Sequence, residues 1–247
     1  MFFWPPPESL GAVQSLVNMG EYDCRMAENR SAERERLLTQ LADEIEQLPT
    51  DPFVRVAVDG VDGSGKTKFA DELRAILENR GRHAIHTTID KFHNPRSVRY
   101  ALGKDSPEGF YRDSFNLGAL KSALLQPLGP SGNGQYRLGV FDLVSDAPKL
   151  EPAEQAPPNS ILILDGVFLH QAELIDWWTM SIWLDVEPAT ALTRWRTREG
   201  VGSLDLNAAE NSRYIAGQQI YIAEADPKNH ATRVIDNNDL LAPRIIY

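Results

Sequence analysis

The stretch that most limits what this chain can fold into runs from Ala57 to Thr67 and reads AVDGVDGSGKT. It holds three glycines, two aspartates and one lysine, and it comes directly after the run FVRV. Glycines allow a tight turn and a close approach of the backbone to a ligand, and amide groups at the start of a helix attract anions. Gly60, Gly65, Lys66 and Thr67 match the pattern G-x-x-x-x-G-K-[ST] of a phosphate-binding loop.

The sequence on either side decides between a phosphate site and a plain glycine-rich turn. FVRVAVDG is β-branched and predicts a strand, whereas KTKFADELRAILENRG predicts an amphipathic helix. The apolar face of that helix holds Phe69, Leu73, Ile76 and Leu77. A strand before the loop and a helix after it form the context that a phosphate-binding loop requires, so the ligand-free turn is disfavoured.

Each residue type in the loop has a definite use if the ligand is ATP. Lys66 supplies a point charge to the β- and γ-phosphates, and the Thr67 hydroxyl can coordinate Mg²⁺. Successive backbone N–H groups form a concavity that holds phosphate oxygens. The residues expected to bind the nucleotide are Gly60, Asp62, Gly63, Ser64, Gly65, Lys66 and Thr67.

The order of the predicted elements indicates the fold class. The strand HAIHTTID follows the helix, and a strand, a helix and a strand within about 35 residues are typical of a βαβ unit and a parallel sheet. The continuous apolar runs ILILDG and SIWLDV predict buried strands, and TRVIDN predicts a last short one. We therefore expect an α/β fold built on a parallel sheet.

The length of 247 residues suits one sizeable α/β domain. Residues 1–30 show no clean periodicity and are expected to be a flexible leader. Ser31 then begins the pattern SAERERLLTQLADEIEQL, whose apolar residues recur at helical spacing and predict an amphipathic helix. Residues 31–247 are expected to form a single domain.

Charge and cysteine content exclude several classes of function. The formal net charge is −10 and the sequence pI is about 5.0, so nucleic-acid binding is not expected, because phosphate backbones require a basic face. Cys24 is the single cysteine, which excludes an internal disulfide and favours the reducing cytoplasm. The N-terminal MFFWPPPES lacks a basic region, and no apolar run is long enough to cross a bilayer, so neither a signal peptide nor a membrane anchor is expected.

Strand-ending aspartates are the candidates for chemistry beyond the loop. Asp90 ends TTID; the carboxyl ends of parallel strands meet at one edge, so Asp90 can accept a proton from an acceptor hydroxyl, or it can cap a turn. Asp165 follows ILIL and can hold Mg²⁺ near Thr67, although an aspartate at a strand end is also common without a metal. Asp185 in IWLDV is the rival for that metal role.

A group of arginines follows in TRWRTREG, at the predicted end of a helix: Arg194, Arg196 and Arg198. Such a group can close over a transferring phosphoryl group as a lid, or it can form a solvated charged face. Arg194 and Arg198 lie one helical turn apart and are therefore the better pair.

Five stretches together resemble the uridine kinase-like P-loop kinases, the branch of nucleoside kinases related to phosphoribulokinase and pantothenate kinase. They are VAVDGVDGSGKTKFADEL, TTIDKFHNPR, DSPEGFYRDSFNLGAL, ILILDGVFL and YIAGQQIYIAEADPKNHATRVIDNND, and the resemblance runs from about residue 53 to the C-terminus. It implies a P-loop NTPase fold with a parallel five-stranded sheet flanked by helices, and a mobile helical lid at about residues 193–212. It also implies that Asp90 activates the acceptor, that Asp165 is the metal-associated acid, and that Arg194 and Arg198 are lid arginines.

Four positions depart from the acceptor pocket of that family. His93 stands in DKFH where a tyrosine is expected, and Asn116 stands in FNL for a ribose-binding aspartate. In FDLVSD, Phe141 replaces a tyrosine and Asp146 replaces a base-reading histidine. An ionised aspartate only accepts hydrogen bonds, whereas a histidine can donate one to a pyrimidine carbonyl. These four residues are the predicted substrate contacts, with His93 equally open as a turn residue, and an acceptor carrying a donor group such as an amine is as open as uridine.

The sequence therefore predicts a kinase that moves the γ-phosphoryl group of ATP to a hydroxyl of a small molecule. Asp90 would act as the base, while Lys66, Arg194 and Arg198 stabilise charge. A nucleotide-binding regulatory switch and a non-catalytic ATP-binding protein are the alternatives, and the sequence lacks the N-K-x-D signature of guanine readers. The expected partners are ATP, Mg²⁺ and the small-molecule acceptor, without nucleic acid or membrane, and a homo-oligomer is left open.

Overall fold

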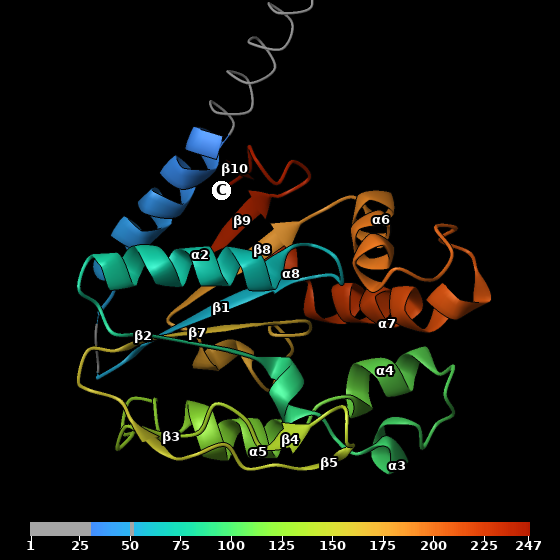
Figure 1. Cartoon of the computed structure of the whole chain (residues 1–247), viewed down its shortest axis with the longest axis horizontal. Helices are drawn as coiled ribbons and strands as arrows, with labels where there is room; N and C mark the ends of the chain where they lie inside the picture. Colours follow the sequence, from blue (N-terminus) through green and yellow to red (C-terminus); the bar gives the residue numbers. More distant parts are fainter. Residues whose placement is uncertain (1–30, 50–51) are drawn as a thin grey trace, which may run out of the picture.

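The structure is a computed structural model that describes residues 31–49 and 52–247, so the predicted leader over residues 1–30 lies outside the described residues. At its centre is a six-stranded sheet in the order β10-β9-β8-β1-β7-β2 (Figure 1). The parallel strands are β1 (Val54–Gly60), β2 (Ala84–Thr88), β7 (Ile161–Gly166), β8 (Met180–Asp185) and β9 (Arg233–Asp236). The predicted α/β fold with five parallel strands is confirmed.

A sixth strand adds to that prediction. β10 (Arg244–Ile245) pairs antiparallel with β9 at the edge of the sheet. It has two residues, which is too short for a recognisable alternation of apolar and polar side chains. The sheet is therefore mixed rather than purely parallel.

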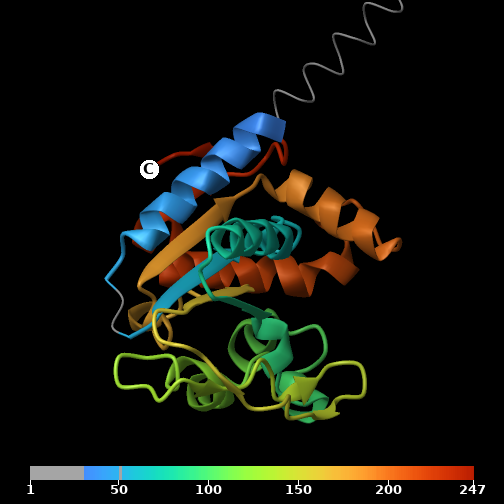
Figure 2. The same cartoon turned by 60° about the vertical axis from the view of Figure 1, so that its left-hand side comes forward.

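Two helices cover one face of the sheet, as the turned view shows (Figure 2). They are a helix over residues 31–46, at the place where the sequence pattern predicts one, and α2 (Lys66–Asn79). The helix residues in this layer are Leu37, Leu38, Leu41, Ile45, Phe69, Leu73 and Leu77. Alternate strand residues meet them, among them Val54, Val56 and Val58, because successive side chains of a strand point to opposite faces. This layer fixes the position of α2 and hence of the loop before it.

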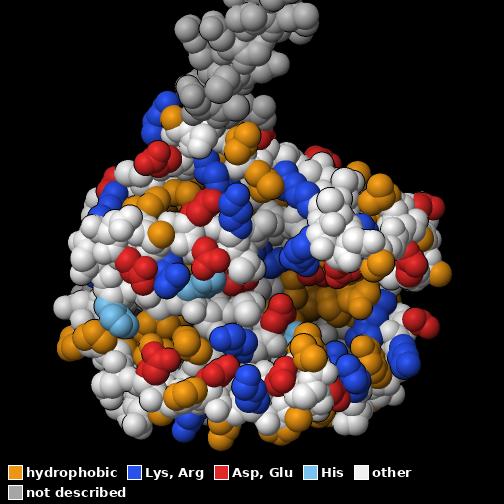
Figure 3. All heavy atoms as spheres, viewed as in Figure 1, with side chains coloured by type: hydrophobic (Ala, Val, Ile, Leu, Met, Phe, Trp, Pro, Cys, Tyr) orange, Lys and Arg blue, Asp and Glu red, His pale blue; other side chains and the backbone are white. Residues whose placement is uncertain are grey.

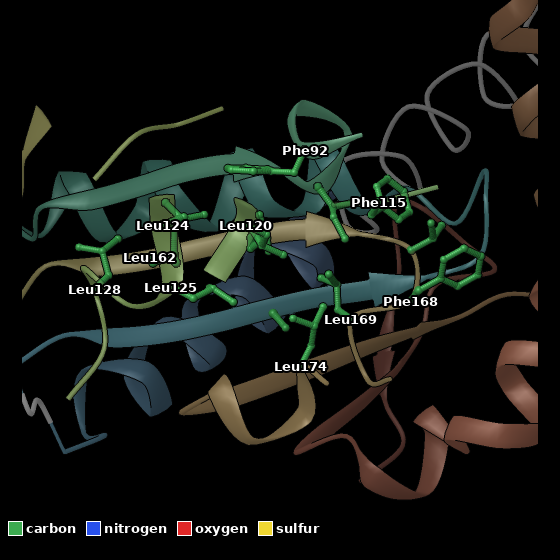
Figure 4. Close-up of a cluster of buried hydrophobic side chains, with 14 of the residues drawn as sticks. Phe92, Phe115, Leu120, Leu124, Leu125, Leu128, Leu162, Phe168, Leu169 and Leu174 are labelled. Carbon is green, nitrogen blue, oxygen red and sulfur yellow. The ribbon is translucent and has the colours of Figure 1, made fainter. Parts of the chain in front are cut away.

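The other face of the sheet is covered by a larger hydrophobic cluster (Figure 4). Its helices are α4 (Pro107–Asp113), α5 (Leu117–Leu120), the π-helical segment Lys121–Leu125 and α7 (Ala209–Ala225). Leu120, Leu124 and Leu125 are fully buried in it, together with Leu162 of β7. The stretch NLGALKSALLQPL is thus helical, with a π-helical turn in the middle.

The remaining elements are short, apart from α6. The helices are α3 (Arg96–Arg99), α6 (Pro188–Glu199) and α8 (Pro227–His230), and the 3-10 segments are Ile89–Phe92 and Ile175–Trp177. Two small antiparallel pairs join β3 (Gln135–Tyr136) to β6 (Glu154–Gln155), and β4 (Phe141–Asp142) to β5 (Ala147–Pro148). The segment 193–212, expected to be a helical lid, comprises the end of α6, a non-helical stretch and the start of α7. In the described ranges, no helix has the length and apolar character needed to cross a membrane.

A buried polar network anchors the end of β1. The Asp59 carboxylate accepts hydrogen bonds from the Gly60 amide at 2.7 Å and from the amide and Nδ1 of His170 at 3.1 and 2.7 Å. The Tyr221 hydroxyl of α7 also donates to Asp59. All these side chains are at most 2% exposed, and burial together with the charge of Asp59 raises the pKa of Tyr221 well above its usual value. The network ties β1, the segment after β7 and α7 together beneath the glycine-rich loop.

We expect Tyr221→Phe to lower the free energy of unfolding by about 1.5–3 kcal/mol, because it removes a buried hydrogen bond to a charged group. Chemical denaturation followed by circular dichroism measures this loss. Tyr247→Phe is the matched control, since Tyr247 is 47% exposed and its hydroxyl donates to the carbonyl of Lys228. It should change the stability by less than about 0.5 kcal/mol. Equal effects of the two variants would contradict a stabilising role for the network.

Candidate functional site

The glycine-rich loop joins the end of β1 at Gly60 to the start of α2 at Lys66. Gly63 and Gly65 have φ angles of +78° and +94°, a region that only glycine enters readily. A Cβ atom at Gly63 would lie 2.0 Å from the carbonyl oxygen of Ala191 in α6, so a side chain has no room there. The loop geometry therefore requires the glycines that the sequence motif contains.

Several hydrogen-bond donors of this loop are unpaired. Among the described residues, the backbone N–H groups of Gly63, Gly65, Lys66 and Thr67 meet no acceptor. The Ser64 hydroxyl oxygen is buried and likewise meets no partner in the described part of the chain. Unpaired donors at the start of a helix are the chemistry that binds phosphate oxygens, so the loop fits the nucleotide phosphates that the motif implies.

Lys66 contributes the cation of the loop. Its Nζ atom donates to the carbonyl oxygen of Val61 at 2.8 Å, so the side chain folds back across the loop. The ammonium group has no carboxylate within ion-pair distance among the residues described. It is therefore placed to meet an anion in the loop by giving up a single neutral partner.

Asp165 lies beside Thr67, at the carboxyl end of β7. The Thr67 hydroxyl donates to Asp165 at 2.8 Å, while the ring of His86 lies 2.8 Å from the other carboxylate oxygen and 2.9 Å from Asp71. Burial disfavours a charged His86, but the two carboxylates outweigh that effect and raise the pKa of His86. One hydroxyl and one carboxylate at this spot suit Mg²⁺, which usually combines one or two such groups with phosphate and water.

Asp185 lies elsewhere at this edge. Its carboxylate accepts from Lys228 Nζ at 2.6 Å and from the indole of Trp183 at 3.4 Å. Asp165, and not Asp185, is thus the acid that contacts Thr67. The geometry favours the first of the two candidates for the metal-associated acid.

Asp90 lies in the 3-10 segment Ile89–Phe92 that follows β2. Its backbone amide donates to the Thr88 hydroxyl at 3.4 Å, and its carbonyl oxygen accepts from His93 Nδ1 at 2.8 Å. The carboxylate itself is exposed and has no hydrogen bond or ion pair with any described residue. Asp90 therefore presents a free acid at the sheet edge where the loop lies.

The carboxyl group of Asp62 in the loop is influenced by the charges of several residues, among them Lys66, Asp90 and Arg198. Burial raises the pKa of Asp62; the charge of Lys66 lowers it, that of Asp90 raises it further, and that of Arg198 lowers it. Charges influence one another in this way only over short distances. Lys66, Asp90 and Arg198, which the sequence predicts to act together, thus all influence the charge of Asp62 in the loop.

The arginines of α6 divide into different roles. Arg194 donates to the backbone carbonyls of Asn237 and Asn238 at 2.9 and 2.5 Å, and Arg196 binds Asn211 at 3.0 Å and Glu199 at 3.1 Å. Arg198 is exposed and makes no hydrogen bond among the described residues. The structure thus places Arg194 differently from the expectation of a free lid cation, because it holds the chain after β9, and it leaves Arg198 as the free cation of the pair.

The four predicted substrate contacts have different surroundings in the structure. His93 packs on the Phe115 ring with centroids 4.6 Å apart, and burial lowers the pKa of His93. The Asn116 side chain accepts from the Ala119 amide at 2.9 Å and so caps α5, while Phe141 is buried in β4. The sequence predicts that these residues contact the substrate. In the structure the side-chain oxygen of Asn116 instead accepts the hydrogen bond that caps α5.

Asp146 is held by two arginines. It accepts from the Arg96 amide at 3.1 Å and from Arg99 at 2.8 Å. Burial opposes its charge, but these donors outweigh that effect and lower the pKa of Asp146. The carboxylate that replaces the expected histidine is thus largely satisfied from within the protein.

Two side chains that sequence reasoning missed support the loop. Gln218 of α7 accepts from the Asp62 amide and donates to its carboxylate, both at 3.0 Å. Asn237, fully buried after β9, donates to the Ser64 carbonyl at 2.7 Å. The polar run IDNND at a strand end could have suggested Asn237, but nothing in the helical pattern around Gln218 indicates its contact.

Figure 3 shows the site from the outside: the face is hollowed near the end of β1, with hydrophobic side chains inside the hollow and basic and acidic ones around it. The sheet order and the loop between β1 and α2 together define an α/β fold with a glycine-rich loop after its central strand β1. Comparison with known proteins gives the same fold. No family model matches the sequence, and no curated protein matches it.

Solved structures do match. A possible uridine kinase from Bacillus stearothermophilus superposes with a TM-score of 0.62 at 19% identity, covering 80% of this chain and 96% of the other. A protein described provisionally as a fructose transport system kinase, from Silicibacter sp. TM1040, superposes with a TM-score of 0.60 at 23% identity, covering 76% and 95%. The superpositions show a shared fold. At identities this low they do not assign a reaction, which has to be inferred from the geometry of the site.

Proposed function

We propose that this chain is a kinase that transfers the γ-phosphoryl group of ATP to a hydroxyl group of a small molecule. The observation that carries the proposal is the free carboxylate of Asp90 beside a loop with unpaired amide donors. A protein that only binds a nucleotide does not require a carboxylate without a partner next to the loop. A base is what an acceptor hydroxyl requires.

The residues then have these roles. Bound ATP and Mg²⁺ supply the phosphoryl group and part of the charge neutralisation. The loop amides and Lys66 hold the phosphates, and Thr67 and Asp165 hold the metal side of the nucleotide. Asp90 accepts the proton of the acceptor hydroxyl, and the hydroxyl oxygen forms the new bond to the γ-phosphorus. The bond between the γ-phosphorus and the bridging oxygen breaks, and ADP leaves. Arg198 stabilises the charge that develops.

A nucleotide-binding switch is the second candidate, because the lid segment and the loop alone serve such a protein as well. A switch needs no acceptor. It therefore releases ADP at the same slow rate whatever hydroxyl compound is present.

The deciding experiment is a screen of ADP release from ATP and Mg²⁺ against nucleosides, sugars, polyols and vitamins, including uridine and fructose, which the names of the structural neighbours suggest. A kinase gives a large increase in ADP release with particular acceptors, and Lys66→Ala provides the blank. Wild-type protein that binds ATP but shows no acceptor dependence across the panel would contradict the proposal and favour the switch.

A further prediction concerns Gln218, which holds both the amide and the carboxylate of Asp62. Gln218→Leu removes both hydrogen bonds, so we expect ATP·Mg²⁺ to bind about fivefold more weakly, equivalent to about 1 kcal/mol, in a calorimetric titration. Gln219→Leu changes the neighbouring, exposed glutamine and should leave the affinity as it is. Equal affinities for the two variants would show that Gln218 does not support the loop.

A further inference from the structure

A cavity of about 660 Å³ lies between α3, the turn that follows it and the start of α7. Its wall includes Arg96, Tyr100, Lys104, Arg213 and Tyr214. In Figure 1, α3, α4 and α7 lie together at the end of the molecule away from the helix over residues 31–46. Its size is that of a pocket for a small organic molecule.

Arg213 is the unusual member of this wall. It is only 7% exposed, yet none of the described carboxylates lies within ion-pair distance of it. Its Nη atoms donate to the backbone carbonyls of Lys104 at 2.6 Å and Arg99 at 3.3 Å, and its buried Nε meets no acceptor in the described part of the chain. A buried guanidinium is thus left with neutral partners and one unpaired donor.

Three aromatic rings surround the same guanidinium. Its central carbon lies 4.7 Å from the ring centroid of Tyr100, 5.7 Å from that of Phe110 and 5.9 Å from that of Tyr214. Cation–π contacts offset only part of the cost of removing a charge from water. The remaining positive charge favours an anion in the cavity.

The other charged groups around the cavity do not remove this preference. Asp105 and Glu210 also line it, but both are exposed to solvent, where their charges are screened. The carboxylate of Asp146, which is 20% exposed, is already bound to Arg99. The side chain of Arg96 is 58% exposed, with its Nε 4.0 Å from Asp146, so its guanidinium remains available to a ligand.

The cavity adjoins the proposed reaction centre. Tyr214 lines the cavity, and its ring packs on that of Trp195 with the centroids 5.0 Å apart. The backbone of Trp195 in turn lies next to Gly63 of the loop. On the other side, the charges of Asp90 and Arg99 both act on His93. Asp90 is thus connected to the cavity wall: His93 donates to the Asp90 carbonyl, Arg99 donates to the carbonyl of Asn94, and Arg213 donates to the carbonyl of Arg99.

We propose that the acceptor carries an oxyanion, either a carboxylate or a phosphate group, and that Arg213 and Arg96 bind it in this cavity while the hydroxyl lies at Asp90. This inference rests on the proposed phosphotransfer and specifies the class of acceptor. The oxyanion provides the counter-charge that Arg213 lacks. The oxyanion also provides a recognition contact in place of the one to a nucleobase. That contact is expected from a histidine at the position of Asp146, and Asp146 itself is bound to two arginines.

The test compares a neutral compound with a related compound that carries one anionic group. The pairs are glycerol with glycerol 3-phosphate, ribose with ribose 5-phosphate, and ribose with ribonate. Each is titrated calorimetrically into the full chain with the loop saturated by ADP and Mg²⁺, so that no turnover is needed. We expect an anionic member to bind about tenfold or more tightly than its neutral partner, and the phosphate and carboxylate members to show which oxyanion is preferred. Absence of any preference for the anionic members would overturn the inference.

Variants separate a binding role from a structural one. Arg96→Gln should reduce the preference about tenfold, and Arg213→Lys should reduce it while retaining the charge in the core. Arg36→Gln removes an exposed arginine on the helix over residues 31–46 and should retain the preference. If Arg213→Lys lowers only the melting temperature and Arg96→Gln changes nothing, the arginines are structural and the inference is wrong.

The same pairs, used as acceptors for ADP release, distinguish the two proposals. Release that depends on neutral acceptors alone would leave the phosphotransfer standing and overturn the anionic class. Tight binding of anionic compounds without any acceptor-dependent release would support the anion site and contradict the kinase.

Discussion

Asp90→Asn should lower the rate of acceptor-dependent ADP release by about 10²–10⁴-fold, the range by which a positioned base contributes. The carboxylate of Asp90 has no partner among the described residues, so the amide costs little stability. Asp90 also makes no hydrogen bond or ion pair with the loop, so the affinity for ATP·Mg²⁺ should change by no more than about twofold. Steady-state ADP release and a calorimetric titration of the same variant measure both quantities.

Asp176→Asn is the control for this substitution. Asp176 is likewise exposed but lies in the 3-10 segment Ile175–Trp177, between β7 and β8. Its replacement should change neither rate nor affinity. Wild-type turnover by Asp90→Asn would show that Asp90 is not the base, whatever the chain phosphorylates.

Gly63→Ala should disrupt the loop itself. The new Cβ atom would lie 2.0 Å from the Ala191 carbonyl, and the φ angle of +78° is strained for alanine. Backbone strain and overpacking together should cost about 2–5 kcal/mol, which corresponds to a fall in melting temperature of about 4–20 °C. ATP binding should be lost with the loop conformation.

Gly81→Ala separates the two causes. Gly81 ends α2 with the same φ angle of +78°, but a Cβ atom there would meet nothing within 4 Å. It should therefore cost only the strain of about 1–2 kcal/mol and leave ATP binding intact. Equal stability losses in the two variants would mean that the contact between the loop and α6 is not close.

The sequence predicted those parts of the site that lie close together along the chain. The strand β1, the glycine-rich loop and α2 form one local unit whose residues each have a distinct preference, so the motif alone indicated their arrangement. Asp165 was also within reach, because its apolar run marks a buried strand that can only lie inside the sheet. The resemblance to uridine kinase-like proteins supplied the number of parallel strands.

The contacts that hold the site from a distance could not be predicted in this way. Arg194 binds carbonyl groups after β9, and Gln218 binds Asp62, across 43 and 156 positions of sequence. The missing counter-ion of Arg213 is a property of three elements packed together. Periodicity shows which face of a helix is apolar, but it does not show which polar residue meets which partner.

The central claim is that the loop from Gly60 to Thr67 binds the phosphates of ATP. Titration of ATP·Mg²⁺ into the wild-type protein and into Lys66→Ala, followed by calorimetry, tests it most directly. We expect saturable binding by the wild-type protein and an affinity about tenfold or more lower without the lysine charge. No measurable binding by the wild-type protein, or equal affinities for the two proteins, would contradict it.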